Sequence, residues 1–272
     1  MIPYYPQPVF HLGPFEIHAF GVLAALAVVV GGRVILVRAH RKGIPVEQMF
    51  RFCFWVYASA MAGAFLSKVV MDPTFLANPT RIFHTGLGVR SVGGISVGFL
   101  AAVAWCRYHK LSLFESMRRL DIIAYAMPTG WMIGRLGCTL AHDHRGLYSS
   151  SWIAVQFPEG PRYDLGLIEF LFLIGMVTAF KLLDRRPRPV GFFFGLYGVV
   201  YGGFRIWLDT LHVQPMRFYG GIAGVVVGLV GWAVMLKLQR STLNDPPNDP
   251  RALAARPLSR QPAVSPARRT AL

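Results

Sequence analysis

The chain has 272 residues, of which 54% are hydrophobic and only 15% are charged, and its mean hydropathy is +0.43. This composition excludes an ordinary soluble domain and indicates a membrane protein. The formal net charge is +15, which in a soluble protein would suggest a nucleic-acid partner. The distribution of that charge along the chain gives it a different meaning.

Seven hydrophobic segments have the length of about 17–25 residues that a membrane-spanning helix needs. In chain order they lie near residues 17–37, 50–71, 92–108, 120–140, 166–183, 190–210 and 217–238. Glycines, a serine and the neighbouring Arg90 dilute the third segment. The sequence therefore predicts an all-α, polytopic membrane protein with seven transmembrane helices.

Lysines and arginines cluster in alternate connections between these segments, whereas the intervening connections are nearly balanced in sign. The basic groups are Arg38, Arg41, Lys42 and Arg51, then Arg107, Lys110, Arg118 and Arg119, then Lys181, Arg185, Arg186 and Arg188. The positive-inside rule then places the N-terminus outside and the C-terminus in the cytoplasm, as an odd number of spans requires. This pattern explains the basic charge without a nucleic-acid partner.

Residues 241–272 are rich in Pro, Ala, Arg, Ser and Asn, a composition that cannot form a core. We therefore predict one transmembrane domain over residues 1–240 and a disordered cytoplasmic tail over 241–272. Glycines four residues apart in the last two segments predict close packing of the sixth and seventh helices. These glycines are Gly191/Gly195, Gly198/Gly202 and Gly220/Gly224/Gly228.

Two arginines, Arg135 and Arg205, lie inside segments that are otherwise apolar. An arginine in a membrane helix costs roughly 2.5–3.5 kcal/mol on insertion scales and by default marks a functional site. A guanidinium binds phosphate oxygens through two parallel hydrogen bonds and stays charged at any working pH. Together they predict a phospholipid headgroup site. The alternative is that they pair with Asp143 or Asp209 and only hold helices together.

The connection after the fourth segment offers His142, Asp143 and His144, groups that transfer protons near neutral pH. We expect them to meet polar groups of the fifth and sixth segments at the outer interface. Those groups are Asp164, Glu169, Tyr201, Arg205 and Asp209. The position of His18 in the first segment leaves open whether it is an interfacial residue or part of this site.

Cys138, His142 and His144 could instead be zinc ligands, because a Cys-x-x-x-His pair can share one helical face. The sequence shows no fourth ligand, and the adjacent arginines disfavour a cation. We therefore expect no metal and no cofactor.

Several short motifs follow one another in order over residues 10–235. They are Leu12-Gly13-Pro14 through Gly21, the pair Gly93-Gly94, Gly134-Arg135-Leu136-Gly137 through Gly146, Leu167-Ile168-Glu169, Arg186 through Gly191, and Tyr201-Gly202-Gly203-Phe204-Arg205. In order and spacing, these motifs resemble those of the bacterial prolipoprotein diacylglyceryl transferase family.

This resemblance implies a multi-pass enzyme of the bacterial inner membrane, with its active site toward the periplasm. The family moves the diacylglyceryl group of phosphatidylglycerol onto the lipobox cysteine thiol of a preprolipoprotein, so both substrates and the lipid bilayer are the implied partners. Carried over by position, Arg135 and Arg205 hold the lipid phosphate, which leaves as glycerol phosphate. The other implied site residues are Asp143, Gly146, Glu169, Tyr201, Gly93, Gly94 and His18.

The chain departs from the family pattern at three positions. The family's histidine before the glycine pair is Val92, its asparagine after Gly-Arg-x-Gly is Cys138, and the usual first-span tyrosine is Phe20. Because the thiol needs deprotonation, we hypothesise that His142 or His144 has taken over proton transfer. Two alternatives stay open: a lipid transferase with another acceptor, and a non-catalytic phospholipid-binding or transport protein.

Overall fold

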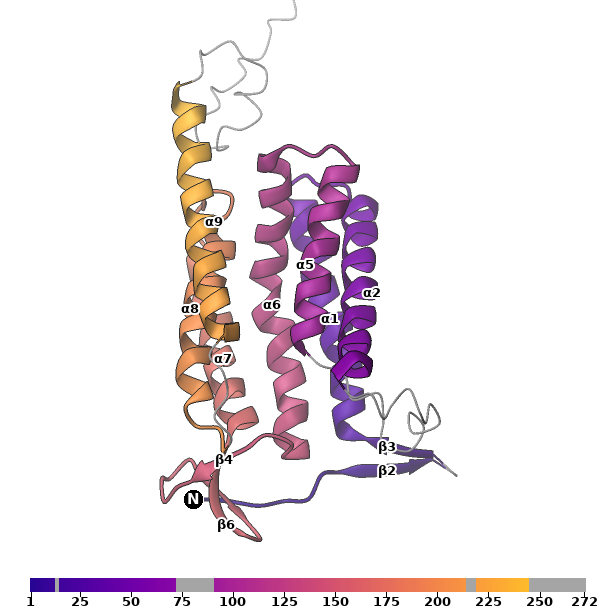
Figure 1. The fold of residues 1–272 in the computed structure, drawn as a ribbon, viewed down its shortest axis with the longest axis vertical. Helices are drawn as coiled ribbons and strands as arrows, with labels where there is room; N and C mark the ends of the chain where they lie inside the picture. Colours follow the sequence, from indigo (N-terminus) through magenta and orange to yellow (C-terminus); the bar gives the residue numbers. More distant parts are fainter. Residues whose placement is uncertain (13–14, 72–90, 214–218, 245–272) are drawn as a thin grey trace, which may run out of the picture.

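The computed structural model describes residues 1–12, 15–71, 91–213 and 219–244 (Figure 1). Seven helices run through these ranges, and each coincides with one of the seven predicted segments. They are α1 (Ala19–Arg41), α2 (Val46–Met71), α5 (Ser91–Tyr108), α6 (Leu113–Ala141), α7 (Leu165–Leu183), α8 (Phe192–Asp209) and α9 (Tyr219–Asn244). Four of them, α1, α2, α7 and α9, are long and apolar enough to cross a membrane.

The protein is mostly helical, but the all-α prediction is incomplete because short strands occupy one end of the bundle. They are β1 (Ile2–Pro3), β2 (Val9–Leu12), β3 (Phe15–His18), β4 (Arg145–Tyr148), β5 (Val155–Phe157) and β6 (Gly160–Asp164). Four strands form a sheet in the order β1-β5-β6-β4, and β2 pairs with β3. The β5–β6 hairpin closes where Phe157 pairs with Gly160, whose φ of 118° favours glycine. Strands this short carry too few residues for a hydrophobic period to be visible in the sequence.

Several predicted boundaries shift, the largest at the start of the fourth segment, where α6 begins at Leu113 and not near residue 120. The first hydrophobic segment was expected from residue 17, but Ile17 and His18 belong to β3 and the helix begins at Ala19. At the other end α9 continues to Asn244, so the first residues of the predicted tail are helical. The rest of that tail, 245–272, lies outside the described residues.

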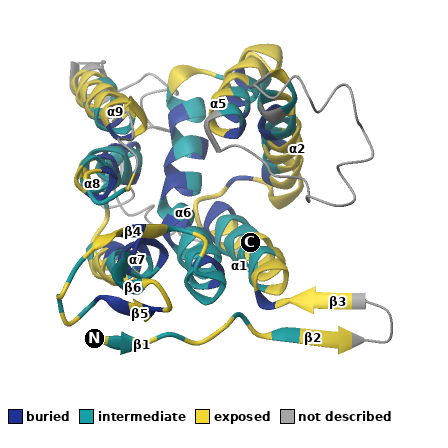
Figure 2. Cartoon of the chain, turned by 60° about the horizontal axis from the view of Figure 1, so that its bottom comes forward, coloured by how far each residue is buried: buried dark blue, intermediate teal, exposed yellow. Residues whose placement is uncertain are grey.

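Helix α6 is the central element of the bundle. Figure 2 shows it between α7, α8 and α9 on one side and α1, α2 and α5 on the other. Its small residues permit close approach: a Cβ on Gly31 of α1 would lie 3.5 Å from the Cα of Gly130, and one on Gly137 would lie 3.2 Å from the Phe20 ring. Helix α6 therefore holds the two halves of the protein together.

Polar contacts fix the end of the bundle opposite the strands. The Arg38 guanidinium donates two hydrogen bonds to Asp184, at 2.7 and 2.9 Å, and lies 3.6 Å over the Tyr125 ring. Asp121 of α6 accepts a 3.0 Å hydrogen bond from the backbone N–H of Phe194, in the first turn of α8. These contacts set the depth of α7 and α8 relative to α1 and α6.

The predicted packing of the last two helices is confirmed. A Cβ on Gly198 of α8 would lie 2.6 Å from the Cα of Gly228, and one on Gly202 would lie 2.7 Å from the carbonyl oxygen of Gly221. The spacing also predicts a contact at Gly220, but a Cβ there would meet nothing within 4 Å. The contact with α8 is made by Gly221 instead. The helices touch backbone to backbone.

We expect Gly198→Ala to destabilise the protein by about 1–3 kcal/mol, because a methyl group there overpacks a backbone contact. Gly203→Ala, in the same helix with open space around it, is the matched control and should be neutral or slightly stabilising. Thermal unfolding of both variants in the same lipid micelles tests this expectation. Equal melting temperatures would contradict the close packing.

Candidate active site

A buried carboxylate, Glu169, organises the end of the bundle next to the strands. Its side chain is 1% exposed and belongs to the second turn of α7. Oε1 accepts hydrogen bonds from the Tyr201 hydroxyl at 2.6 Å and from the Trp131 indole N–H at 2.9 Å. Oε2 lies 3.0 Å from Nε of Arg135 and 3.2 Å from Nη1 of Arg205. One carboxylate thus ties together three helices.

The charges of this cluster balance. Arg205 also donates a 2.7 Å hydrogen bond from Nη2 to Asp209, one turn further along α8. Two guanidiniums therefore face two carboxylates, which offsets the cost of burying each charge alone. The predicted convergence of Glu169, Tyr201 and the arginines is confirmed.

Arg205 pairs with Asp209, as the structural alternative expects, whereas Arg135 pairs with Glu169 and not with Asp143. The pairing does not use up either guanidinium, since each offers five N–H donors. The Arg135 and Arg205 side chains are 14% and 22% exposed, whereas the Glu169 carboxylate between them is buried. The cluster can therefore present cationic donors to an anion that approaches from outside.

The two histidines of the connecting segment have different environments. His142 ends α6 in the left-handed conformation, with φ of 50°. Its Nδ1 lies 2.6 Å from Asp164 and its Nε2 lies 3.1 Å from the carbonyl oxygen of Tyr5. Both ring nitrogens of His142 thus have a hydrogen-bond partner. His142 thereby joins α6 to the N-terminal segment and to α7.

Asp164 completes this structural junction. Its second oxygen accepts a 3.1 Å hydrogen bond from the backbone N–H of Leu167 and so caps α7. Burial raises the pKa of this carboxyl, and the hydrogen bond from His142 opposes that rise. The position of Glu169 one turn further along α7 depends on this cap.

His144 turns the other way, toward the arginine cluster. Its Nε2 lies 3.9 Å from Oδ1 of Asp143, and both side chains are about two-fifths exposed. Burial lowers the pKa of His144, the neighbouring Asp143 raises it and Arg135 lowers it further. The imidazole is therefore neutral near pH 7, the form that accepts a proton or binds a metal ion.

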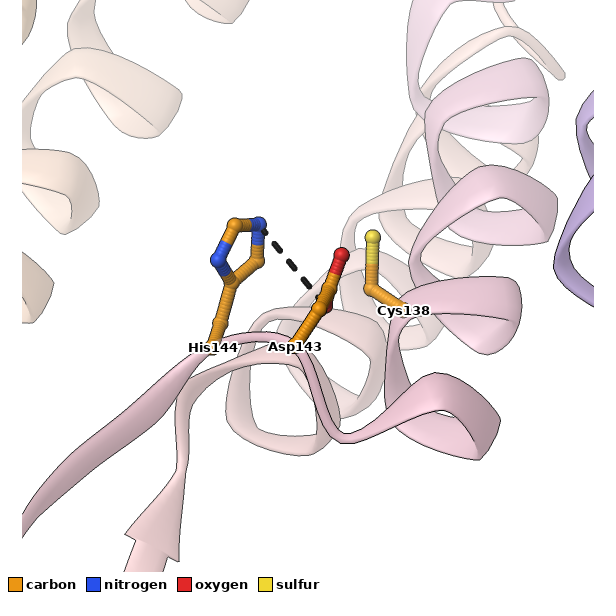
Figure 3. A group of neighbouring side chains, drawn as sticks. All are labelled: Cys138, Asp143 and His144. Atoms are coloured by element: carbon orange, nitrogen blue, oxygen red, sulfur yellow. Dashed lines mark ion pairs between the residues drawn. The ribbon is translucent and has the colours of Figure 1, made fainter. Parts of the chain in front are cut away.

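Cys138 lies beside this pair, as Figure 3 shows. The ligand atoms of Cys138, Asp143 and His144 all lie within 4.8 Å of one another. The Cys138 sulfur also accepts a 3.6 Å hydrogen bond from Nη1 of Arg135. The sequence suggested His142 as a partner of this cysteine, but the structure brings Asp143 there in its place.

The remaining predicted residues have packing positions. Gly146 is buried in β4, where a Cβ would lie 2.8 Å from the carbonyl oxygen of Leu211. Gly93 and Gly94 begin α5 and face α2; a Cβ on Gly94 would lie 3.2 Å from the Ala60 carbonyl oxygen. His18 is exposed in β3 and pairs with Val9. No described contact joins the glycine pair or His18 to the arginine cluster.

Trp131 is a site residue that sequence reasoning missed. Its indole donates to Glu169, and its ring lies 5.7 Å from the Arg135 guanidinium. The available signal was its position one helical turn before Arg135, which puts both side chains on one face of α6.

These features define a helical bundle of the integral-membrane type, in which two guanidiniums lie around a buried carboxylate at one end. The sequence model of the prolipoprotein diacylglyceryl transferase family matches residues 7–239. The chain belongs to this family.

Several relatives carry the name phosphatidylglycerol–prolipoprotein diacylglyceryl transferase. One from Pseudomonas aeruginosa is 31% identical over 265 residues, covering 89% of this chain and 98% of the relative. Others from Pseudomonas putida and Pseudomonas entomophila are each 30% identical over 255 residues, covering 88% of this chain and 90% of the relative. The similarity extends over nearly the whole of each protein.

We expect Glu169→Gln to destabilise the protein by about 3–5 kcal/mol, because it leaves Arg135 without its carboxylate partner and Arg205 with Asp209 alone. Glu159→Gln, which breaks the exposed pair with Arg145, should cost at most about 1 kcal/mol. The free energies of unfolding of both variants, measured in the same micelles, test this expectation. Similar stabilities would show that Glu169 does not organise the site.

Proposed function

We propose that this protein transfers the diacylglyceryl group of phosphatidylglycerol to the lipobox cysteine thiol of preprolipoproteins. The observation that carries the proposal is the pair of guanidiniums held around Glu169 in a member of this family. In the reaction, the acceptor thiolate attacks the glycerol carbon that bears the phosphate ester. A sulfur–carbon bond forms, the carbon–oxygen bond breaks, and glycerol phosphate leaves with the electron pair.

Arg135 and Arg205 bind the lipid phosphate in this proposal. The leaving oxygen gains negative charge as its bond to carbon breaks, and fixed cations in a partly dry site stabilise that charge. The salt bridges to Glu169 and Asp209 hold both guanidiniums in place before substrate arrives. Trp131 and Tyr201 hold Glu169 in turn.

The deprotonation of the acceptor thiol depends on His144 and Asp143 and not on His142. The neutral imidazole of His144 lies beside Asp143 and faces the cluster that contains Arg135. His142 is engaged by Asp164 and Tyr5. The sequence left His142 and His144 as candidates, and this assignment keeps only His144.

An apolar pocket of about 410 Å³ between α7 and α8 suits an acyl chain of the lipid. It begins at Leu171, close after Glu169 on α7, and extends to Leu183. At a rise of 1.5 Å per residue that span is about 18 Å, close to half of the roughly 30 Å hydrocarbon thickness of a bilayer. A lipid with its phosphate at the arginines would lay one chain there.

We also propose that all seven helices span the bacterial inner membrane, with the N-terminus and the site on the periplasmic side. The strands lie at the end of the bundle where α6 and α8 end and α7 begins (Figure 1), and the arginine cluster is carried by those parts of the three helices. The basic groups that follow α1, α5 and α7 lie at the ends of those helices remote from the strands. The positive-inside rule assigns that remote end to the cytoplasm.

We expect Arg135→Ala and Arg205→Ala each to lower transfer at least about a hundredfold, the loss seen when one donor to a developing oxyanion is removed. Arg135→Lys and Arg205→Lys should recover little, because an ammonium lacks the planar fork of a guanidinium. Transfer from phosphatidylglycerol to a lipobox peptide, measured by mass spectrometry on normally inserted variants, tests this. Full activity in either alanine variant contradicts the proposed phosphate site.

We expect His144→Ala to lower transfer by about 10²–10⁴-fold, because it removes a group on which deprotonation of the acceptor thiol depends. His142→Ala should lower stability, since Asp164 loses its partner, but should retain most of the activity of the folded fraction. Comparing initial rates with the amount of folded protein separates the two effects. If His142→Ala lost transfer while His144→Ala kept it, deprotonation of the acceptor thiol would depend on His142 instead.

A further inference from the structure

We propose that Cys138, Asp143 and His144 form a zinc site whose open fourth position binds the acceptor thiol as a thiolate. The inference rests on the proposed function and explains how the thiol is activated in a chain with valine at position 92. Cys138 occupies the asparagine position of the family motif and has no other role in the proposed reaction. Coordination of zinc would give Cys138 a role in the reaction.

The backbone of α6 produces the ligand geometry. The left-handed turn at His142 folds the chain back over the last turn of the helix, which brings Asp143 and His144 beside Cys138 (Figure 3). Their ligand atoms lie within 4.8 Å of one another. Tetrahedral zinc with bonds of about 2.0–2.3 Å places its ligand atoms roughly 3.5 Å apart. Small rotations of the two partly exposed side chains would close this difference.

The three donors suit zinc in kind and number. Thiolate, imidazole and carboxylate are the groups that bind Zn²⁺ in proteins, and sites with three protein ligands keep a fourth position for water or substrate. His142 is not available as that fourth ligand, because Asp164 and Tyr5 occupy both of its ring nitrogens. The arrangement is therefore that of an open site.

The adjacent arginine does not prevent cation binding. The charge of Arg135 is compensated by Glu169, whose Oε2 lies 3.0 Å from its Nε. The same guanidinium donates a hydrogen bond to the Cys138 sulfur, and the thiolate is the form of cysteine that binds metal. Deprotonated Cys138 and Asp143 supply two negative charges, which match one Zn²⁺.

The position of the site fits the reaction. A thiol that coordinates zinc is deprotonated outright, and its proton passes to solvent at the exposed side of Asp143 and His144. The resulting thiolate attacks the glycerol carbon while the phosphate leaves toward Arg135. Because Arg135 contacts Cys138 directly, the nucleophile and the leaving group would be held side by side. No electron is gained or lost by the metal.

Cobalt substitution tests the site without relying on turnover. The chelator-treated protein is loaded with Co²⁺, and the thiolate-to-cobalt absorption band is recorded for the wild type, for Cys138→Ser and for Cys53→Ser. Cys53 is a free cysteine within α2 and serves as the matched control. We expect the band in the wild type and in Cys53→Ser, and at least about tenfold weaker binding in Cys138→Ser, the loss that follows even from removing outer-shell partners.

A lipobox peptide should strengthen the cobalt band by adding a second thiolate, and the same peptide with serine in place of cysteine should not. Transfer should be lost after chelation and restored by Zn²⁺. Absence of the band in the wild type, its persistence in Cys138→Ser, or full transfer by the chelated protein overturns the zinc site. A peptide-responsive band in a protein that transfers no lipid supports the site and contradicts the proposed function.

Discussion

The sharing of one buried carboxylate by two guanidiniums is the constraint on which the rest of this structure depends. Glu169 is held to α6 by a hydrogen bond from Trp131 and an ion pair with Arg135, and to α8 by hydrogen bonds from Tyr201 and Arg205. A charge at 1% exposure is tolerated only when opposite charges and donors surround it. The three helices must therefore meet at this depth, and the contacts of Arg38 and Asp121 at the other end keep them in that register.

At the end of α6, two neighbouring histidines have different roles. His142 holds the structure, and His144 is the proposed reactive group. The left-handed turn at His142 directs that imidazole to Asp164 and Tyr5, which anchors the N-terminal segment against the cap of α7. The same turn directs His144 back to the arginine cluster. One backbone feature, the left-handed turn at His142, thus positions both the N-terminal segment and His144. Disturbing the sheet should therefore also displace the proposed reactive groups.

In the proposed reaction, the departure at Cys138 falls beside the acceptor thiol, whereas the two arginines proposed to bind phosphate are retained. Arg135, Glu169 and Arg205 form the cluster expected of the family motifs. Cys138 replaces an amide side chain with a potential thiolate, next to Asp143 and His144. A family can keep its leaving-group site and change how the nucleophile is activated, because the two tasks are performed by different side chains.

The sequence by itself determined the helices, the close approach of α8 and α9 and the importance of Arg135 and Arg205. Each is a local property: an apolar run of sufficient length, glycines four apart, or a cation inside an apolar segment. Only the tertiary structure decided which carboxylate pairs with Arg135, that Trp131 joins the cluster, and which histidine faces it. Those choices depend on the rotation of α6 against α7 and on one left-handed residue, and neither leaves a periodic trace in the chain.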